Sequence, residues 1–348
     1  MGLMNAALFY GPGDVRFERI PIPTPGPGEV LLKIEAALTC GTDIKTYQRG
    51  HPTLIKKTPS TFGHELSGTI VEVGAGVTRF RPGMRVVPAN SAPCFTCFYC
   101  ASGQPHLCED LLMVNGAYAE YMAIPARIVE HNLLELPPDL SFQEAALCEP
   151  LACAVHGADR SGIKLGDTVV VIGSGPLGLM LARLAHLRGA RTILLGKGEE
   201  RLAQGRRLGV DETIDIAGGG DRVQAVRALT PGGRGADVVI EAVGRPEVWQ
   251  EAVLMARKGG LAVLFGGCKS GTTITVDTGL LHYSEVKLEG VYHHTPNTFR
   301  RALSLLASRR VDGREFIRAT LPLSQLLEAF GRVKALEGIK YAIDPTVM

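Results

Sequence analysis

Four cysteines gather in one short stretch of this 348-residue chain, at a spacing that suits a metal ion. The pattern is C-x2-C-x2-C-x7-C, and prolines and glycines among the cysteines favour a loop. Four thiolates complete the tetrahedral coordination of one Zn²⁺ and leave no position open for water. We therefore expect a structural zinc site, in a lobe spanning residues 90–110, formed by Cys94, Cys97, Cys100 and Cys108.

A second group of ligand-type residues surrounds this lobe in the chain: Cys40, His64, Glu65 and Glu149. A thiolate, an imidazole and a carboxylate are a ligand set typical of catalytic zinc, which keeps one position free for water or substrate. Each residue also has an ordinary structural interpretation, as a core cysteine, a core histidine, a surface charge or a helix N-terminal carboxylate. Spacing alone leaves the catalytic and the structural interpretations equally open.

A glycine-rich segment is typical of a dinucleotide-binding loop. It follows the strand-like run Thr168–Ile172 and precedes a helix with apolar residues on one face. Gly173 allows a tight turn, Gly175 lets the backbone approach a pyrophosphate, and Gly178 permits close helix–strand packing. The helix N-terminus, with Pro176 and Leu177, then faces the phosphates.

The position after the next predicted strand favours one of the two nicotinamide cofactors. NAD enzymes generally carry an acidic residue there that binds the ribose 2′-hydroxyl, whereas this chain has Gly196 followed by Lys197. Lys197 and Arg201 could pair with a 2′-phosphate, which favours NADP(H) over NAD(H). The alternative is that Lys197 is a solvated loop residue and that Glu199 or Glu200 reaches the ribose of NAD.

Composition excludes several classes of protein. The net charge is +2, without a block of five like charges, so nothing favours nucleic acid or an anionic membrane as a partner. The most apolar stretch, Thr168–Leu187, contains glycines, a proline and an arginine, and it predicts strand-turn-helix instead of a membrane span. The first residues lack the pattern of a signal peptide, and cysteines at zinc spacing favour a reducing cytoplasm.

The pattern of apolar runs changes near Glu149. Before it, short runs such as Val30–Ile34 and Thr69–Val73 between Gly/Pro clusters predict a β-rich region, with the proline-rich Ile20–Gly28 as an extended surface connection. After it, apolar runs at 192–195, 238–240 and 261–265 alternate with helical stretches. Runs this apolar predict strands buried on both faces of a parallel sheet. A helix at 299–308 and a last strand at 341–347 complete the expectation.

Taken together, these motifs resemble the zinc-dependent medium-chain dehydrogenase/reductase superfamily. They occur in that family's order over nearly the whole chain, and Glu149-Pro150 resembles its sorbitol (polyol) and threonine dehydrogenase branch. The motifs that carry the resemblance are Cys40-Gly-Thr-Asp43, Gly63-His-Glu65, Val73-Gly-Ala-Gly76, the four-cysteine lobe, Glu149-Pro-Leu-Ala-Cys153 and the dinucleotide loop.

The resemblance implies an α/β fold with two domains. Residues 1–149 would form a GroES-like, β-rich catalytic domain that residues 295–348 complete, and residues 150–294 a Rossmann domain with a doubly wound parallel sheet. It also implies two Zn²⁺ per chain, with Cys40, His64 and either Glu65 or Glu149 around the catalytic ion. Cys148, Cys153 and Cys268 match no ligand position and are expected in the core, and histidines such as His106, His293 and His294 are treated as structural.

The family's chemistry implies roles for two further residues. Thr42 would accept the proton of the substrate hydroxyl, although it could instead be a turn residue that bonds its own backbone. The family's proton relay usually ends at a histidine where this chain has Lys45, which near its free pKa of about 10.4 relays protons poorly. Either the proton leaves through water, or Lys45 has a depressed pKa, or it binds an anionic part of the substrate, or it is a solvated loop lysine.

The expected function is hydride transfer between a secondary alcohol, a polyol or a sugar phosphate, or the corresponding ketone, and NADP(H) or NAD(H). The alternatives are an L-threonine 3-dehydrogenase-like enzyme and a non-catalytic relative that binds zinc and nucleotide. The resemblance also implies a homo-oligomer, either a tetramer or a dimer.

Overall fold

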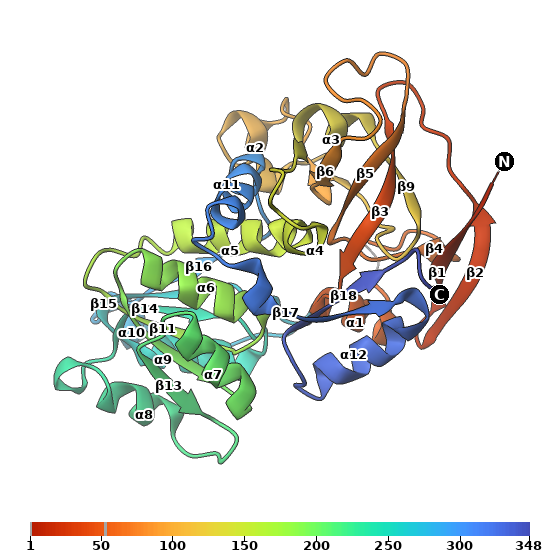
Figure 1. The fold of residues 1–348 in the computed structure, drawn as a ribbon. Helices are drawn as coiled ribbons and strands as arrows, with labels where there is room; N and C mark the ends of the chain where they lie inside the picture. The colour runs from red at the N-terminus through yellow and green to blue at the C-terminus, as the bar shows by residue number, and fades with distance from the viewer. Residues whose placement is uncertain (1, 52–53) are drawn as a thin grey trace. The chain divides into compact units, whose positions relative to one another are not determined.

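The computed structural model describes residues 2–51 and 54–348, and the chain divides into two compact units. The first unit comprises Met1–Ala152 and Thr295–Met348, and the second comprises Cys153–His294. The predicted boundary after Glu149 therefore falls just inside the first unit. The ribbon shows a β-rich region in red to yellow and an α/β region in green to cyan (Figure 1).

The second unit is built on a six-stranded sheet with the order β13-β12-β11-β14-β15-β16, and every neighbouring pair is parallel. From the central strand β11, the next two strands in sequence, β12 and β13, are added on one side, and β14, β15 and β16 are added on the other side. This strand order is that of a doubly wound fold. The strands are β11 (Thr168–Ile172), β12 (Arg191–Gly196), β13 (Glu212–Asp215), β14 (Ala236–Glu241), β15 (Ala256–Leu264) and β16 (Lys287–Gly290).

Helices cover both faces of this sheet, as the apolar runs predict. Ile193 and Leu195 of β12 belong to the core that also contains Val226 and Val248 of the helices on one face. Leu194, between them, points to the other face, where it lies close to Gly205. The helices are α6 (Pro176–Leu187), α7 (Glu199–Arg207), α8 (Arg222–Ala228), α9 (Pro246–Met255) and α10 (Thr278–His282), and α5 (Cys148–Arg160) leads into the unit.

The described residues of the first unit form three sheets, which are antiparallel or mixed. The largest has seven strands in the order β10-β6-β5-β3-β18-β17, with β9 paired to β3. A three-stranded sheet has the order β2-β1-β4, and β7 pairs with β8. The strands are β1 (Leu3–Gly11), β2 (Asp14–Pro21), β3 (Val30–Leu38), β4 (Ser60–Thr61), β5 (Leu66–Val73), β6 (Arg85–Pro88), β7 (Ser91–Ala92), β8 (Leu112–Met113), β9 (Tyr121–Ile124), β10 (Leu133–Glu135), β17 (Ile317–Pro322) and β18 (Lys340–Asp344).

The C-terminal segment is part of the first unit because β18 pairs antiparallel with β3 and parallel with β17. Short helices link the strands, and the capping box between Thr295 and Thr298 marks where the C-terminal segment begins a helix. The helices of the unit are α1 (Gly41–Arg49), α2 (Phe98–Ala101), α3 (Ala126–His131), α4 (Phe142–Ala146), α11 (Pro296–Ala307) and α12 (Leu326–Lys334).

Two local expectations differ from the structure. The proline-rich connection begins later than predicted, because β2 is an edge strand and retains Pro21 in register with Leu3. The strand predicted at 261–265 starts at Ala256, which pairs with β14.

Two of the three cysteines assigned to the core are only half-buried. Cys148 is fully buried, but Cys153 and Cys268 are partly exposed. Within residues 2–51 and 54–348, every helix is too short or too polar to cross a membrane.

Candidate metal and cofactor sites

Three residues of the second predicted ligand group lie together in the first unit. The ligand atoms of Cys40, His64 and Glu65 lie within 4.8 Å of one another. Cys40 is the N-cap of α1, directly after β3, and His64 and Glu65 precede the neighbouring strand β5. The turn needs Gly63, whose φ is +91° and where a Cβ atom would lie 2.7 Å from the ring of Tyr118. A thiolate, an imidazole and a carboxylate at this separation fit one zinc ion.

A buried hydrogen-bond chain orients His64. Its Nδ1 lies 2.9 Å from Oδ1 of Asp43, and the hydroxyl of Tyr118 donates to Oδ2 of Asp43 at 2.7 Å. An aspartate accepts from the Nδ1 hydrogen, which leaves Nε2 free to bind a metal. Burial by itself would lower the pKa of His64, but Asp43 and Cys40 outweigh it and hold that pKa well above its usual range. Without a metal ion the ring therefore favours its protonated form, and binding a metal through Nε2 requires the loss of that proton.

Glu65 forms a buried ion pair with Lys340 of β18. The Lys340 Nζ lies 2.8 Å from Oε1 and 2.5 Å from Oε2 of Glu65, and it also donates to the Thr39 carbonyl at 2.8 Å. Lys340 is 1% exposed and Glu65 0% exposed. Burial lowers the pKa of Lys340, and the nearby Glu65 more than reverses this, so the net shift is upward. The lysine therefore remains a cation inside the protein.

Glu149 is buried near this group but does not belong to the cluster of three. It lies in the first turn of α5, and Asn90 donates a hydrogen bond from Nδ2 to its Oε1 at 3.1 Å. Burial, only partly opposed by His64, raises the pKa of Glu149 to about 7. Among the described residues of this unit, the ligand atoms of Cys40 and His64 form a close group with Glu65.

Thr42 and Lys45 both lie on α1. The Thr42 amide donates to the Cys40 sulfur at 3.4 Å, and the Thr42 side chain is half-buried. Thr42 therefore lies beside the candidate zinc ligand Cys40. Lys45 is exposed.

The four lobe cysteines also lie together, with their sulfur atoms within 4.8 Å of one another. The Cys97 and Cys108 sulfurs are 3.9 Å apart. Two thiolates at about 2.3 Å from a tetrahedral zinc ion are separated by about 3.8 Å, so this spacing fits the metal. Hydrogen bonds from Thr96 lower the pKa of Cys94 to about 6, while burial raises that of Cys100 to about 12.

The dinucleotide loop has the geometry that its glycines predict. Gly173 has φ +119°, and a Cβ atom at Gly178 would lie 1.8 Å from the Gly173 carbonyl oxygen. Around Gly175 no atom lies within 4 Å of the place a Cβ would take, among the residues described. Pro176 is the first residue of α6, and Leu177 is partly buried in its first turn. The loop fits a pyrophosphate at the start of a helix.

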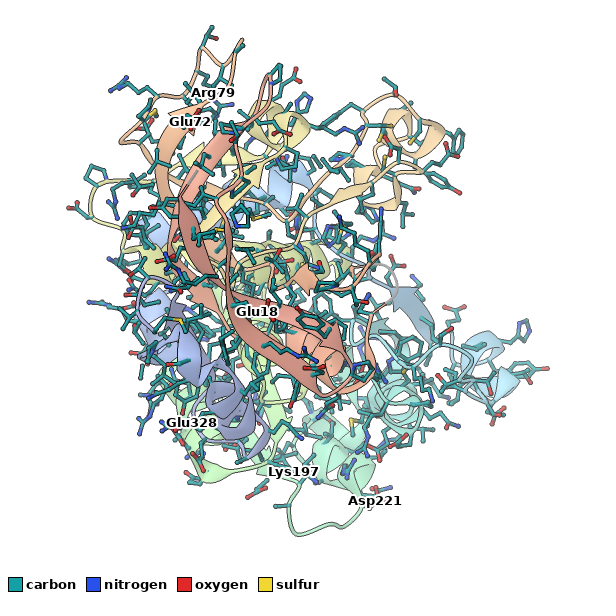
Figure 2. The ribbon with its side chains drawn as sticks, turned by 90° about the vertical axis from the view of Figure 1, so that its right-hand side faces the viewer. Glu18, Glu72, Arg79, Lys197, Asp221 and Glu328 are labelled. Atoms are coloured by element: carbon teal, nitrogen blue, oxygen red, sulfur yellow. The ribbon has the colours of Figure 1, made fainter. Side chains whose placement is uncertain are left out.

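Gly196, at the end of β12, has no room for an acidic side chain. A Cβ atom there would lie 2.2 Å from Oγ and 2.3 Å from Cβ of Ser174. Lys197 is exposed and labelled in Figure 2. Arg201, one turn into α7, is only 7% exposed, and burial lowers its pKa. The usual carboxylate is thus excluded sterically, and two basic residues follow.

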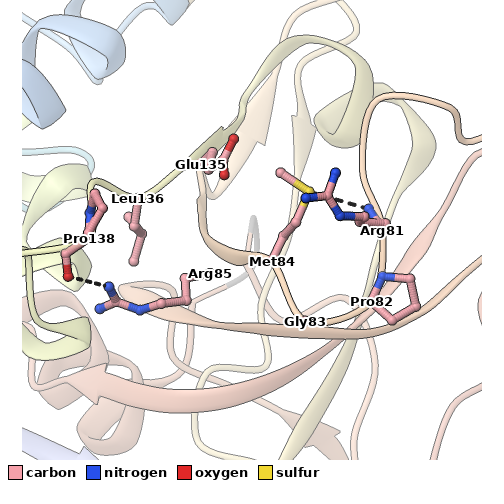
Figure 3. A pocket seen from close by; sticks show the side chains of 8 residues that line it. All are labelled: Arg81, Pro82, Gly83, Met84, Arg85, Glu135, Leu136 and Pro138. Atoms are coloured by element: carbon pink, nitrogen blue, oxygen red, sulfur yellow. Dashed lines mark hydrogen bonds between the residues drawn. The ribbon is translucent and has the colours of Figure 1, made fainter.

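A separate surface pocket of about 460 Å³ lies between β6 and β10, lined by residues 81–85, 135–136 and Pro138. Figure 3 shows the Arg85 guanidinium turned to the Pro138 carbonyl, to which it donates at 2.8 Å. The lining contains none of the ligand groups described above. We assign no role to this pocket in the chemistry of the protein.

Several residues of the candidate site carry no signal of their role in the sequence. Asp43 lies in the Cys40-Gly-Thr-Asp43 motif, but the motif does not predict its contact with His64. Tyr118 and Lys340 carry no local signal, because they reach the site from distant strands and loops.

Comparisons with known proteins agree with this arrangement. Residues 26–137 match the alcohol dehydrogenase GroES-like domain, and residues 176–308 match the zinc-binding dehydrogenase domain. Sorbitol dehydrogenase of Gallus gallus is 33% identical over 98% of this chain and 97% of its own length. The Homo sapiens enzyme of the same name is 33% identical over 97% of this chain and 96% of its own.

Solved structures resemble the chain over nearly its full length. A zinc-binding dehydrogenase from Sinorhizobium meliloti 1021 bound to NADP has a TM-score of 0.91 and 31% identity, covering 99% of this chain and 100% of that one. The 2R,3R-butanediol dehydrogenase from Bacillus subtilis has a TM-score of 0.87 and 28% identity, covering 98% and 99%.

These matches confirm the predicted pairing of a GroES-like domain with a Rossmann domain. They also confirm zinc and a nicotinamide as the cofactors of an alcohol or polyol dehydrogenase. Because a third of its residues are identical to sorbitol dehydrogenases over almost the entire length, the chain belongs to the zinc-dependent medium-chain dehydrogenase/reductase superfamily, in its sorbitol (polyol) dehydrogenase branch.

Proposed function

We propose that this protein oxidises a secondary hydroxyl of a polyol, or reduces the corresponding ketone, with NADP(H) as the preferred cofactor. In this proposal residues 1–149 and 295–348 form the catalytic domain, and residues 150–294 bind the dinucleotide. The observation that carries the proposal is the close approach of Cys40, His64 and Glu65, which is a ligand set suited to catalytic zinc. A second zinc ion, bound by the four lobe cysteines, would stabilise the lobe.

The chain's own residues divide the catalytic work. A zinc ion bound by Cys40, His64 and Glu65 would supply Lewis acidity, which lowers the pKa of an alcohol oxygen. Thr42, next to Cys40, accepts the hydroxyl proton and passes it outward. Asp43 and Tyr118 hold the ring of His64 in one orientation. Glu149 supplies a second buried carboxylate that can replace Glu65 as a ligand.

The cofactor proposal depends on the end of β12. Ser174 fills the space that an acidic side chain at Gly196 would need, so a 2′-phosphate meets no negative charge there. Lys197 and Arg201 supply positive charge on the following turn. A solved relative of 31% identity was crystallised with NADP, which agrees with this preference.

Lys45 allows a narrower proposal about the substrate. It occupies the position where the family's proton relay usually has a histidine, and it is exposed on α1. A cation there suits a substrate with an acidic or phosphorylated end. The proton of the substrate would then leave Thr42 through water.

We also propose that the chain forms a dimer or a tetramer, as the family resemblance implies. Light scattering after size-exclusion chromatography measures the mass directly, and a mass of a single 37.2 kDa chain would contradict this proposal.

The first experiment is a matrix of initial rates with the purified protein. Polyols, sugar phosphates, simple secondary alcohols and threonine are each tested with NAD⁺ and with NADP⁺, together with zinc content per chain. We expect turnover of a vicinal diol, faster with NADP⁺, and two zinc ions. Preference for NAD⁺ would contradict the cofactor proposal alone, and preference for threonine would favour the amino-alcohol alternative. Absence of turnover with a single zinc ion would support a non-catalytic relative.

A further inference from the structure

Lys340 raises a question that the proposed function does not answer. The site of Cys40, His64 and Glu65 suits a zinc dication, yet the positively charged Lys340 is buried beside one of its candidate ligands, Glu65. Lys340 is one of the largest fully buried side chains of the described protein, and it reaches Glu65 from 275 residues away in sequence. Burial of a charged group is costly without strong compensation, so its position needs a reason.

The hydrogen bonds of Lys340 are fully used. An ammonium group has three donors, and the Nζ of Lys340 has three acceptors within hydrogen-bond distance: the Thr39 carbonyl and the two oxygens of Glu65. The lysine therefore holds the carboxylate by both oxygens and is itself held by the backbone that follows β3. The pair has little freedom to rotate, because both side chains are almost completely shielded from solvent.

This pairing limits how strongly Glu65 can bind a cation. Each carboxylate oxygen has about two acceptor sites, and Lys340 occupies one on each oxygen. One site remains on each oxygen, so the carboxylate can still bind a metal ion, but the ammonium charge repels a dication there and weakens that bond. Lys340 donates directly to Glu65, whereas His64 is supported by an anion and the Cys40 sulfur accepts a hydrogen bond from the Thr42 amide. The three ligands are thus unequal in strength.

We propose that Lys340 is a positioning residue that keeps Glu65 a weak and displaceable zinc ligand, so that a coordination position can open for water or substrate. This inference rests on the proposed zinc site at Cys40, His64 and Glu65. It assigns a function to a residue of the C-terminal strand that touches neither substrate nor cofactor in this role. Loss of the lysine should make Glu65 a stronger ligand and the zinc ion harder to remove.

The test measures zinc release instead of turnover. The intact protein is mixed with a chromogenic chelator, and the release phase that depends on Cys40 is identified with Cys40→Ala. We expect Lys340→Met to slow that phase at least about 10-fold, the scale on which partners of metal ligands act. Lys340→Arg, which keeps the cation, should restore the native rate. In Co²⁺-substituted protein, Lys340→Met should also change the visible absorption bands, because the ligand field changes.

A double variant separates this role from simple structural support. If Lys340 acts through Glu65, Lys340→Met has no effect on zinc release in a Glu65→Gln background. Lys33→Met is the matched control, because Lys33 pairs with Glu35 on the neighbouring strand β3 but is partly exposed. Lys340→Gln serves if the methionine variant does not fold, since its amide can still donate to Thr39.

Each outcome is decisive. Release that is no slower in Lys340→Met or Lys340→Gln would overturn the inference, and so would a slowing that persists in the Glu65→Gln background. If Cys40→Ala leaves the zinc content unchanged, the proposed catalytic zinc and this inference both fail. A Cys40-dependent zinc ion with native release in the Lys340 variants overturns only the role of Lys340.

Discussion

The Nδ1 atom of His64 lies 2.9 Å from Oδ1 of Asp43, and both side chains are buried. This contact joins a candidate zinc ligand to an anion on the first turn of α1, which also begins at the candidate ligand Cys40. One short helix therefore supplies a ligand, the orienting partner of a second ligand, and Thr42. The arrangement explains why these residue types occur so close together in the chain.

Asp43→Asn should weaken zinc binding about 10- to 100-fold, because an amide no longer stabilises the His64 tautomer that binds through Nε2. Competition with a chelator measures the affinity. Tyr118→Phe should have a smaller effect in the same direction, since Asp43 keeps its charge. Asp14→Asn, which removes an exposed ion pair with Arg16, is the control and should leave zinc binding unchanged. Native affinity in Asp43→Asn would contradict the role of this pair.

Thr42→Val should lower kcat by about 10²- to 10⁴-fold, the usual contribution of a positioned proton acceptor. Thr42→Ser keeps the hydroxyl and should retain most of the activity. Steady-state kinetics with the best substrate, together with zinc content, separates loss of proton transfer from loss of metal. Equal rates for the valine and serine variants would show that the hydroxyl has no part in the reaction.

Lys197→Asp should shift cofactor preference from NADP⁺ towards NAD⁺ at least about 10-fold, since one charge-assisted hydrogen bond contributes about 1.5–3 kcal/mol. The ratio of kcat/KM for the two cofactors is the measurement. Lys258→Asp places the same charge on an exposed position of the same unit and should leave the ratio unchanged. An unchanged ratio in Lys197→Asp would mean that the lysine is a solvated loop residue.

The lobe cysteines should differ in reactivity once zinc is removed. Hydrogen bonds from Thr96 lower the pKa of Cys94 to about 6, so this cysteine is largely a thiolate at pH 7. Burial raises the pKa of Cys100 to about 12, so it remains a thiol. Iodoacetamide at pH 7, followed by peptide mass spectrometry, should modify Cys94 first and Cys100 last. Zinc-loaded protein should resist both modifications, and uniform labelling would contradict the assignment.

Glu149 should make the metal-depleted protein less stable as the pH rises. Its pKa is about 7 in the folded state and about 4.5 in an ordinary environment, so folding favours the protonated form. Its contribution to the free energy of unfolding is complete below about pH 4.5 and is lost as the pH rises through about 7, by up to about 3 kcal/mol. Urea unfolding of the native protein and of Glu149→Gln measures this difference. Parallel pH profiles for the two proteins would rule it out.

Much of the fold was predictable because its signals are local. The run Thr168–Ile172 is buried in full, as expected for four consecutive apolar residues of a parallel sheet. Gly173 is required because its φ is positive, and Gly178 is required because its backbone lies close to the Gly173 carbonyl oxygen. Both requirements arise within a segment of six residues. The four lobe cysteines lie within fifteen residues of sequence, so their spacing alone predicts a shared metal ion.

The candidate catalytic site was predictable only in part. The ligand types and the motif order predict Cys40, His64, Glu65 and Glu149 as candidate ligands, but spacing does not choose between the two glutamates. In the structure, the start of β5 brings Glu65 next to Cys40, which follows the end of β3. The register between two strands depends on pairing between distant parts of the chain, so a local sequence pattern does not predict it.

Sequence by itself determined most of the elements, the four-cysteine lobe and the glycine-rich loop, because each depends on residues a few positions apart. Only the tertiary structure decided that Lys340 neutralises Glu65 and that Tyr118 supports Asp43. A buried charge is stable only beside its partner, and that partner is chosen by how distant strands pack, not by distance along the chain. The sheet that pairs β18 with β3 therefore completes the site.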